Sequence, residues 1–195
     1  MIAAVVLAAG ESSRMGRDKA LLPFRGSTFL EHIVSTLRQA QVKKMVVVLG
    51  HHAQQVQGSV KLGDTEVVVN PRYREGQTTS LQAGLLTLNE EVEGILLCLV
   101  DHPLLSVSLV RKLIEAFQKQ KSPAVIPTYK GERGHPVIFA RALFSGFQAL
   151  GPDEGANLVA RRHRAETAFL EVDDATILRD IDTLADYEKL IAEER

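Results

Sequence analysis

The 195-residue sequence predicts an α/β domain built around a mostly parallel, mixed sheet. Short apolar runs rich in β-branched residues or leucine alternate with segments of helical periodicity. These runs are apolar throughout, which is typical of strands buried on both faces of a parallel sheet. Polar loops separate the segments, and neither a repeat nor a long linker interrupts them. We therefore expect a single three-layer, Rossmann-like domain over residues 1–195, with helices on both faces of the sheet.

The strands are expected at seven apolar runs. These are Ile2–Leu7, Met45–Leu49, Glu66–Val69, Gly94–Val100, Ala124–Pro127, Pro136–Phe139 and Phe169–Val172. Helices are expected at Phe29–Ala40, Ser80–Leu88 and Val107–Gln118 and after Thr183. The pattern Thr28-x-x-Glu31 has the spacing of a capping box, and Thr183-x-x-Asp186 marks the start of the last helix in a similar way.

Composition excludes several classes of function. Lys and Arg number 23 against 24 Asp and Glu, a formal net charge of −1, so a nucleic-acid or membrane-surface role based on overall charge is not expected. No apolar run approaches the ~20 residues that span a bilayer. The single cysteine, Cys98, excludes an internal disulfide and a Cys-rich zinc site. The first ten residues lack the basic start of a signal peptide, so we expect a cytoplasmic protein without nucleic-acid or membrane partners.

The expected sheet also predicts where a ligand binds. In open α/β sheets, ligands lie outside the carboxyl ends of the strands. The loops that follow strands span residues 8–19, 50–53, 70–80, 101–104 and 180–183, and most of the unusual polar residues fall within them. We therefore expect these five loops to form the functional site.

The first loop combines small residues with two cations. Its sequence from Leu7 is Leu-Ala-Ala-Gly-Glu-Ser-Ser-Arg-Met-Gly, and Lys19 follows three residues later. Small side chains let backbone N–H groups approach an anion, and Arg14 and Lys19 add charge-assisted donors for phosphate oxygens. The spacing from Gly10 to Gly16 does not fit a Walker A loop, and a G-x-G-x-x-G dinucleotide fingerprint is absent, which argues against a dehydrogenase. A plain Gly/Ser turn with two solvated cations is the alternative.

Carboxylates at the same expected edge are candidate metal ligands. Asp101 directly follows a buried strand, and Asp180 and Asp182 precede the last helix. Side chains two apart on an extended segment face the same way, so both can reach one ion. Mg²⁺ takes one or two carboxylates together with substrate phosphates. A loop or cap carboxylate at Asp101 and a favourable helix-dipole position at Asp182 are the structural alternatives.

The segment LAAGESSRMGRDKALLPFRG resembles the signature L-A-A-G-x-S-x-R-M-G…K…L-P of the MobA-like nucleotidyltransferases, most closely the molybdenum cofactor cytidylyltransferase branch (MocA type). Later blocks of the family match in order, and the resemblance covers nearly the whole chain. They are Asn70-Pro71 with Gly76–Leu81, Asp101–Leu104, Gly134-His135-Pro136 and Asp180–Thr183. The chain lacks the proline that usually follows the threonine of the last block.

The resemblance implies a fold similar to the nucleoside-diphospho-sugar transferases and the transfer of CMP from CTP to the terminal phosphate of a molybdenum-pterin cofactor, with release of pyrophosphate. It implies Mg²⁺, with Mn²⁺ as an alternative, and transient contact with an enzyme that accepts the cofactor. Four groups of residues follow from it. They are Lys19, Arg14 and Asp101 for catalysis; Leu7, Ala8, Ala9, Gly10, Ser12, Ser13, Arg14, Lys19, Gly76 and Ser80 for the nucleotide; Asp101, Asp180 and Asp182 for the metal; and Arg133, Gly134 and His135 for the acceptor.

Structural explanations compete with several of these assignments. Thr79 or Ser80 can act as a helix N-cap, and the Lys130-Gly131 turn with His135 can be a solvated hairpin with a structural histidine. His51 and His52 can border the nucleotide or lie exposed, and the basic run 161–164 is typical of a solvated helix face. Rival functions are a guanylyltransferase or another NTP:phosphate-acceptor nucleotidyltransferase of the superfamily, or a non-catalytic module that binds a nucleotide or cofactor.

Overall fold

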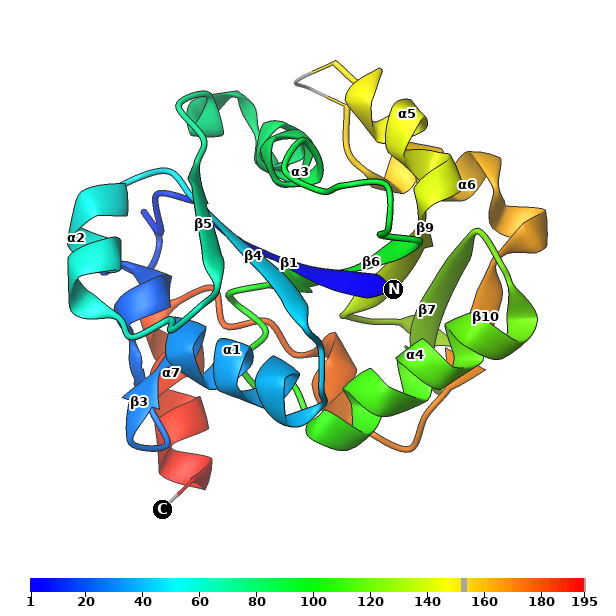
Figure 1. Cartoon of the computed structure of the whole chain (residues 1–195). Helices are drawn as coiled ribbons and strands as arrows, with labels where there is room; N and C mark the ends of the chain where they lie inside the picture. The colour runs from blue at the N-terminus through cyan, green and yellow to red at the C-terminus, as the bar shows by residue number, and fades with distance from the viewer. Residues whose placement is uncertain (152–153, 195) are drawn as a thin grey trace.

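The computed structural model of the chain describes residues 1–151 and 154–194 and shows one twisted sheet between two layers of helices (Figure 1). Seven strands are hydrogen-bonded in the order β10-β7-β9-β6-β1-β4-β5, and β8 pairs with β7. The strand pairs among β5, β4, β1 and β6 are parallel, as is β10 with β7, whereas β9 runs antiparallel to both β6 and β7. This single α/β domain with a mixed sheet confirms the expected fold class.

The seven strands predicted from the apolar runs are present, with ends that differ by at most two residues, whereas the sequence does not predict the short strand β8. Their bounds are β1 Ile2–Ala8, β4 Lys44–Leu49, β5 Glu66–Val69, β6 Gly94–Leu99, β7 Ala124–Tyr129, β8 Glu132–Arg133, β9 Val137–Ala140 and β10 Ala168–Glu171. A separate small hairpin joins β2 (Pro23–Phe24) to β3 (Ser27–Thr28). Both Lys130 and Gly131 have positive φ in the turn between β7 and β8, as a tight two-residue hairpin turn requires.

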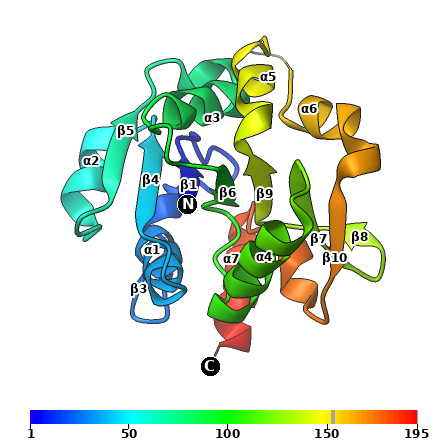
Figure 2. The same cartoon turned by 45° about the vertical axis from the view of Figure 1, so that its right-hand side comes forward.

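Side chains alternate between two cores because the central strands are buried on both faces. Ala4 and Val6 of β1 belong to the core beneath α1 (Phe29–Gln39) and α4 (Val107–Gln120). Val5 and Leu7 belong to the opposite core, which α3 (Gln77–Leu85), α5 (Phe144–Gln148) and α6 (Asn157–Arg162) cover. Figure 2 shows these helices on opposite sides of the sheet. The short helix α2 (Ala53–Ser59) lies at the β5 end.

Helix starts follow local capping chemistry in two cases and depart from the expectation in one. The Thr28 hydroxyl accepts a hydrogen bond from the Glu31 N–H, and the reciprocal bond completes the predicted capping box of α1. Thr183 caps α7 (Leu184–Glu193) in the same way. The helix expected from Ser80 instead begins at Gln77, with Gly76 at its N-cap at φ 111°. The interpretation of Thr79 or Ser80 as an N-cap is therefore wrong, because both lie inside the helix.

The C-terminal segment packs against the end of the first loop. Ile181 and Leu190 share a small core with Phe24 and Phe29, and the ring of Phe29 contacts Tyr187 edge to face. In Figure 1, α7 (red) accordingly lies beside the blue β2–β3 hairpin. This packing brings the residues just before α7 to the sheet edge that carries the first loop. Among the described residues, no helix has both the length and the apolar character to cross a bilayer.

Candidate functional site

The carboxyl ends of β1, β4 and β6 coincide. Leu7 pairs with Leu99, and Ala8 with Leu49, so the loops that follow these strands leave the sheet together. The loops after β1 and β6 line a cavity of about 260 Å³. Its lining comprises Leu7, Ala8, Ala9, Gly10, Ser12, Ser13, Arg14, Asp18, Lys19, Tyr73, Gln77, Ser80, Leu99, Val100, Asp101 and Asp182. Four of the five expected loops thus line one cavity, whereas the loop 50–53 does not.

The first loop folds back on itself at Ser12. The Ser12 carbonyl accepts hydrogen bonds from the N–H groups of Met15 and Gly16 at 3.0 and 3.1 Å. The Ser12 hydroxyl accepts a third from the Lys19 N–H at 3.1 Å. The carboxylate of Asp18 caps the short 3₁₀ turn that begins at Lys19 by accepting from the Ala20 N–H. These bonds fix the backbone of Lys19 and direct its side chain toward the cavity.

Two cations and two carboxylates converge in this cavity. The Lys19 Nζ lies 2.5 Å from Oδ1 of Asp182 and 3.4 Å from Oδ2 of Asp101, and the Lys19 side chain is only 11% exposed. Arg14 reaches Oδ2 of Asp182 at 2.8 Å. The Ile181 N–H donates to the Asp101 carbonyl at 2.8 Å, which ties the C-terminal segment to the end of β6. The hydrogen bond from Lys19, helped by the charge of Arg14, lowers the pKa of the Asp182 carboxyl below its ordinary value.

The acidic side of the cavity fits a divalent cation that is shared with a substrate. Oδ1 of Asp101 is buried and accepts no hydrogen bond from the residues that the structure describes. Within the same residues, no cluster of three or more His, Cys, Asp or Glu side chains could hold a metal ion. Two carboxylates with one free buried oxygen suit Mg²⁺ or Mn²⁺ only if phosphate oxygens complete the shell. Asp182 lines the cavity, whereas Asp180 is exposed and lies outside it.

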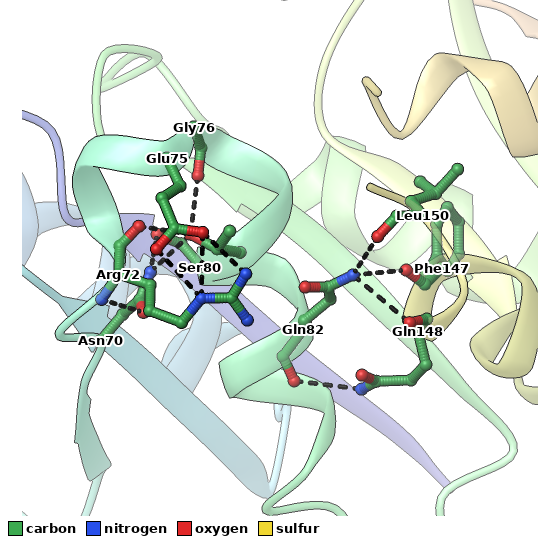
Figure 3. Close-up of polar contacts among 10 residues, drawn as sticks. Asn70, Arg72, Glu75, Gly76, Ser80, Gln82, Phe147, Gln148 and Leu150 are labelled. Carbon is green, nitrogen blue, oxygen red and sulfur yellow. Dashed lines mark hydrogen bonds and ion pairs between the residues drawn. The ribbon is translucent and has the colours of Figure 1, made fainter. Parts of the chain in front are cut away.

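The N-terminal half of α3 is held by a buried amide (Figure 3). The side chain of Asn70, only 2% exposed, donates to Oγ1 of Thr79 at 2.9 Å and to Oγ of Ser80 at 3.0 Å. Further along α3, Gln82 donates to the carbonyls of Phe147 and Leu150, both at 3.0 Å, and so fixes α3 against α5. Ser80 lines the cavity from this braced position.

The loop after β4 reaches the cavity indirectly. His51 and His52 stack with ring centres 3.7 Å apart, and Nδ1 of His51 lies 3.2 Å from the hydroxyl of Tyr73. Tyr73 lines the cavity, but neither histidine does. The structure thus places the histidines behind a tyrosine rather than at the edge of the cavity.

A second, larger cavity contains all three residues assigned to the acceptor. Arg133, Gly134 and His135 line a hollow of about 490 Å³. Its apolar wall includes Leu97, Ile126, Val137, Phe139 and Phe169. An intervening hollow of about 250 Å³ shares Leu7 with the first cavity and Leu97 with the second, and Gln77 borders all three. The first and second cavities are therefore adjacent.

Three arginines surround the second cavity. Arg161 and Arg164 line it together with Arg133, and none of the three forms an ion pair with a carboxylate in residues 1–151 or 154–194. The guanidinium of Arg133 lies 5.0 Å from the ring centre of Phe169. Arg161 and Arg164 are exposed, as the solvated-face interpretation of the run 161–164 expects, and they also line this cavity. The helix ends at Arg162, and the 3₁₀ turn Arg164–Glu166 continues along the cavity.

A half-buried histidine pair lies beside the second cavity, which His135 lines. The rings of His102 and His135 are 4.9 Å apart, and Nδ1 of each is buried without a partner among the described residues. Burial, reinforced by the neighbouring His102, lowers the pKa of His135 to about 4. Burial likewise lowers the pKa of His102, against the opposing charges of Asp101 and Asp180. His135 is therefore neutral at pH 7 and presents an uncharged ring to the second cavity.

Most of the residues assigned from the sequence come together, with two departures. Gly76 borders the intervening hollow rather than the first cavity, and Asp180 lines none of the three. Sequence reasoning missed Asp18, Tyr73 and Gln77. The last two lie in the loop 70–80 that follows the third strand, where an aromatic and an amide side chain were the available signals. Arg161 and Arg164 carried no local signal, because their role depends on where α6 lies.

The first cavity combines a loop of small residues with paired cations and carboxylates, and an arginine-lined cavity adjoins it. These features define an α/β protein whose site at the carboxyl edge of the sheet suits phosphate groups. The chain belongs to the MobA-like NTP transferase domain family, whose model matches residues 4–168.

Two curated relatives and two solved structures align with almost the whole chain. Nicotine blue oxidoreductase of Paenarthrobacter nicotinovorans is 31% identical, covering 97% of this chain and 96% of its own. Molybdenum cofactor cytidylyltransferase of Escherichia coli strain K12 is 26% identical, covering 98% and 95%. The crystal structure of Rv0371c from Mycobacterium tuberculosis superimposes with a TM-score of 0.89 at 32% identity, covering 98% and 97%. A manganese complex of Rv0371c gives 0.83 at 30% identity, with 98% of both chains covered.

Proposed function

We propose that this protein transfers CMP from CTP to the terminal phosphate of a molybdenum-pterin cofactor and releases pyrophosphate. The observation that carries the proposal is the convergence of Lys19 and Arg14 with Asp101 and Asp182 in one cavity beside the small-residue loop. Family membership supports nucleotidyl transfer, and the E. coli cytidylyltransferase relative supports the choice of nucleotide and acceptor.

The proposed chemistry needs charge neutralisation more than a general base. An acceptor phosphate is already ionised near pH 7, so its oxygen can attack the α-phosphorus directly while pyrophosphate leaves in line. Lys19 and Arg14 would exchange their contacts with Asp182 for phosphate oxygens, and the backbone of Gly10 to Ser13 would cradle the phosphate chain. Positioning and preorganised charge then supply the rate enhancement.

Asp101 and Asp182 are the residues that would hold a divalent cation. The buried, unpaired Oδ1 of Asp101 supports this role, and so does the depressed pKa of Asp182, which keeps that carboxyl ionised. Bound Mg²⁺ or Mn²⁺ would neutralise negative charge on the triphosphate. The manganese complex of Rv0371c shows that a relative was solved with such an ion.

The second cavity is the proposed acceptor site. Arg133, Arg161 and Arg164 offer charge-assisted donors to anionic groups, and the wall that includes Phe169 suits a flat ring system. Gln77, which borders both cavities, would lie where the two substrates meet. A cytoplasmic location and transient contact with an enzyme that accepts the finished cofactor belong to the same proposal.

The test is incubation with CTP, GTP, ATP or UTP, Mg²⁺ or Mn²⁺, and molybdenum-loaded pterin cofactor, followed by pyrophosphate assay and mass analysis of the product. We expect the CMP adduct with CTP. A GMP adduct would favour the guanylyltransferase alternative, and binding without turnover would favour a non-catalytic module. Because one relative is named an oxidoreductase, a parallel incubation contains NADPH together with an electron-accepting dye. Oxidation of NADPH in the absence of any pyrophosphate release would contradict the proposal.

A further inference from the structure

Three of the four hydrogen-bonding positions of the buried Asn70 amide are occupied (Figure 3). Its Oδ1 accepts from the Arg72 N–H at 2.9 Å, and this bond to a backbone donor identifies which end of the amide is oxygen. The nitrogen end therefore faces α3, where its two hydrogens go to Oγ1 of Thr79 and Oγ of Ser80. The amide thus acts as a fixed donor to both hydroxyls.

The hydroxyl groups of Thr79 and Ser80 differ in the hydrogen bonds that they donate. Thr79 can donate to the carbonyl of Arg72 or of Gly76, each 2.9 Å away. The Ser80 hydroxyl makes no donated bond to any residue in the described ranges 1–151 and 154–194, although Ser80 is only 3% exposed. Ser80 lines the first cavity, and Thr79 does not. Asn70 occupies one lone pair of the Ser80 oxygen, and because the hydroxyl donates no bond, its hydrogen is left for an acceptor inside the cavity.

We propose that Asn70 is a positioning residue that fixes the Ser80 hydroxyl as a hydrogen-bond donor to the nucleobase and thereby selects cytosine over uracil. This inference rests on the proposed nucleotide site. Cytosine presents an acceptor nitrogen at N3, which matches the Ser80 donor. Uracil presents an N3–H at the same position, which Ser80 can accept only with its remaining lone pair, and its own hydrogen is then left without an acceptor in a buried place.

The direct test is Asn70→Asp, which keeps the shape of the side chain and reverses the polarity facing α3. A carboxylate still accepts from the Arg72 N–H but also accepts from both hydroxyls, so Ser80 must then offer its lone pairs to the base. Dissociation constants for CTP and UTP are measured by calorimetry with wild type and variant. We expect wild type to prefer CTP and the preference ratio to shift toward UTP by about tenfold or more in the variant. Equal weakening of both nucleotides would show a merely structural role and overturn the inference.

Two further variants keep the test decisive if the buried carboxylate impairs folding. Ser80→Ala removes the donor, and the CTP preference should fall toward one. Thr79→Val is the matched control, because it removes a hydroxyl bound to the same amide but outside the cavity, and it should lower the thermal midpoint with the nucleotide ratio unchanged. An altered ratio in Thr79→Val, or an unaltered one in Ser80→Ala, would contradict the inference. Wild type that binds CTP and UTP equally would overturn the inference alone, whereas wild type that binds no nucleotide would overturn the proposed function as well.

Discussion

At the scale of single residues, the charged side chains of the first cavity form ion pairs with one another. Asp182 faces both Lys19 and Arg14, and Asp101 shares Lys19 while one of its oxygens stays free. Opposite charges at these distances satisfy each other in the absence of substrate and can be redistributed when phosphate and a cation enter. The same groups thus hold the C-terminal segment in place and serve the proposed chemistry.

Removing the carboxylate of Asp101 separates these two roles. Asp101→Ala should lower kcat by about a thousandfold or more, because a preorganised charge next to the triphosphate is lost. Pyrophosphate release measures the effect, and circular dichroism checks the fold. Asp173→Ala, at an exposed position in the bend after β10, is the matched control and should retain wild-type turnover. Full activity of the Asp101 variant would eliminate the proposed metal role.

Burial of His135 predicts a specific pH dependence of stability. Its folded-state pKa of about 4 lies below the ordinary value of 6.5, so the unfolded chain takes up the proton first as the pH falls. The stability is therefore complete above pH 6.5 and is lost between 6.5 and 4, by about 3 kcal/mol if His135 alone titrates. Denaturant unfolding at several pH values should show a shallower dependence in His135→Gln. The control His163→Gln, beside the surface turn Arg164–Glu166, should follow wild type, and equal slopes in all three proteins would contradict the assignment.

At the scale of elements, the position of α6 determines whether the arginines of the basic run 161–164 face only solvent or also line a cavity. Val159 is buried against the sheet-covering core, and this contact turns Arg161 toward the second cavity, which Arg164 also lines. Arg162, between them in sequence, does not line it. The short helix and the 3₁₀ turn that follows it therefore place Arg161 and Arg164 along the cavity and leave Arg162 outside it.

The pair Arg161→Ala and Arg164→Ala tests the acceptor role of this element. Each substitution should raise the KM for the phosphate-bearing acceptor by roughly tenfold, since a charge-assisted hydrogen bond is lost. The dissociation constant of the NTP should be unchanged, because neither arginine lines the first cavity. Steady-state kinetics with varied acceptor measure the effect, and Arg162→Ala should behave as wild type. An acceptor KM equally sensitive to Arg162→Ala would point to general electrostatic attraction instead.

At the scale of the whole molecule, the first cavity is assembled from both ends of the chain. The first loop contributes Lys19, the end of β6 contributes Asp101, and the segment before α7 contributes Asp182. A nucleotide that contacts all three residues therefore connects segments that are far apart in the chain. Because it binds only the folded protein, its binding stabilises the native state through mass action.

Thermal unfolding measures this linkage. CTP at 100 times its dissociation constant, with Mg²⁺, should add ~2.7 kcal/mol, or roughly 5–10 °C in Tm for a protein of this size. The same CTP concentration in EDTA should give a smaller shift, since the charges of Asp101 and Asp182 then oppose the triphosphate. An identical shift with and without the divalent cation would argue against a cation site at these carboxylates.

The sequence by itself determined the strands, the capped helix starts and the polar loops, because these depend on local periodicity and on contacts between near neighbours. It also placed Lys19, Arg14 and Asp101 in a common region, since the carboxyl ends of parallel strands meet at one edge. Only the tertiary structure decided that Asp182 rather than Asp180 enters the cavity, that Arg161 and Arg164 border the second one, and that Ser80 lies within α3 with its hydroxyl engaged by Asn70. These outcomes depend on packing between segments that are far apart in the chain. A helix or loop that rotates or shifts by one residue in such packing exposes a side chain that was buried and buries its neighbour.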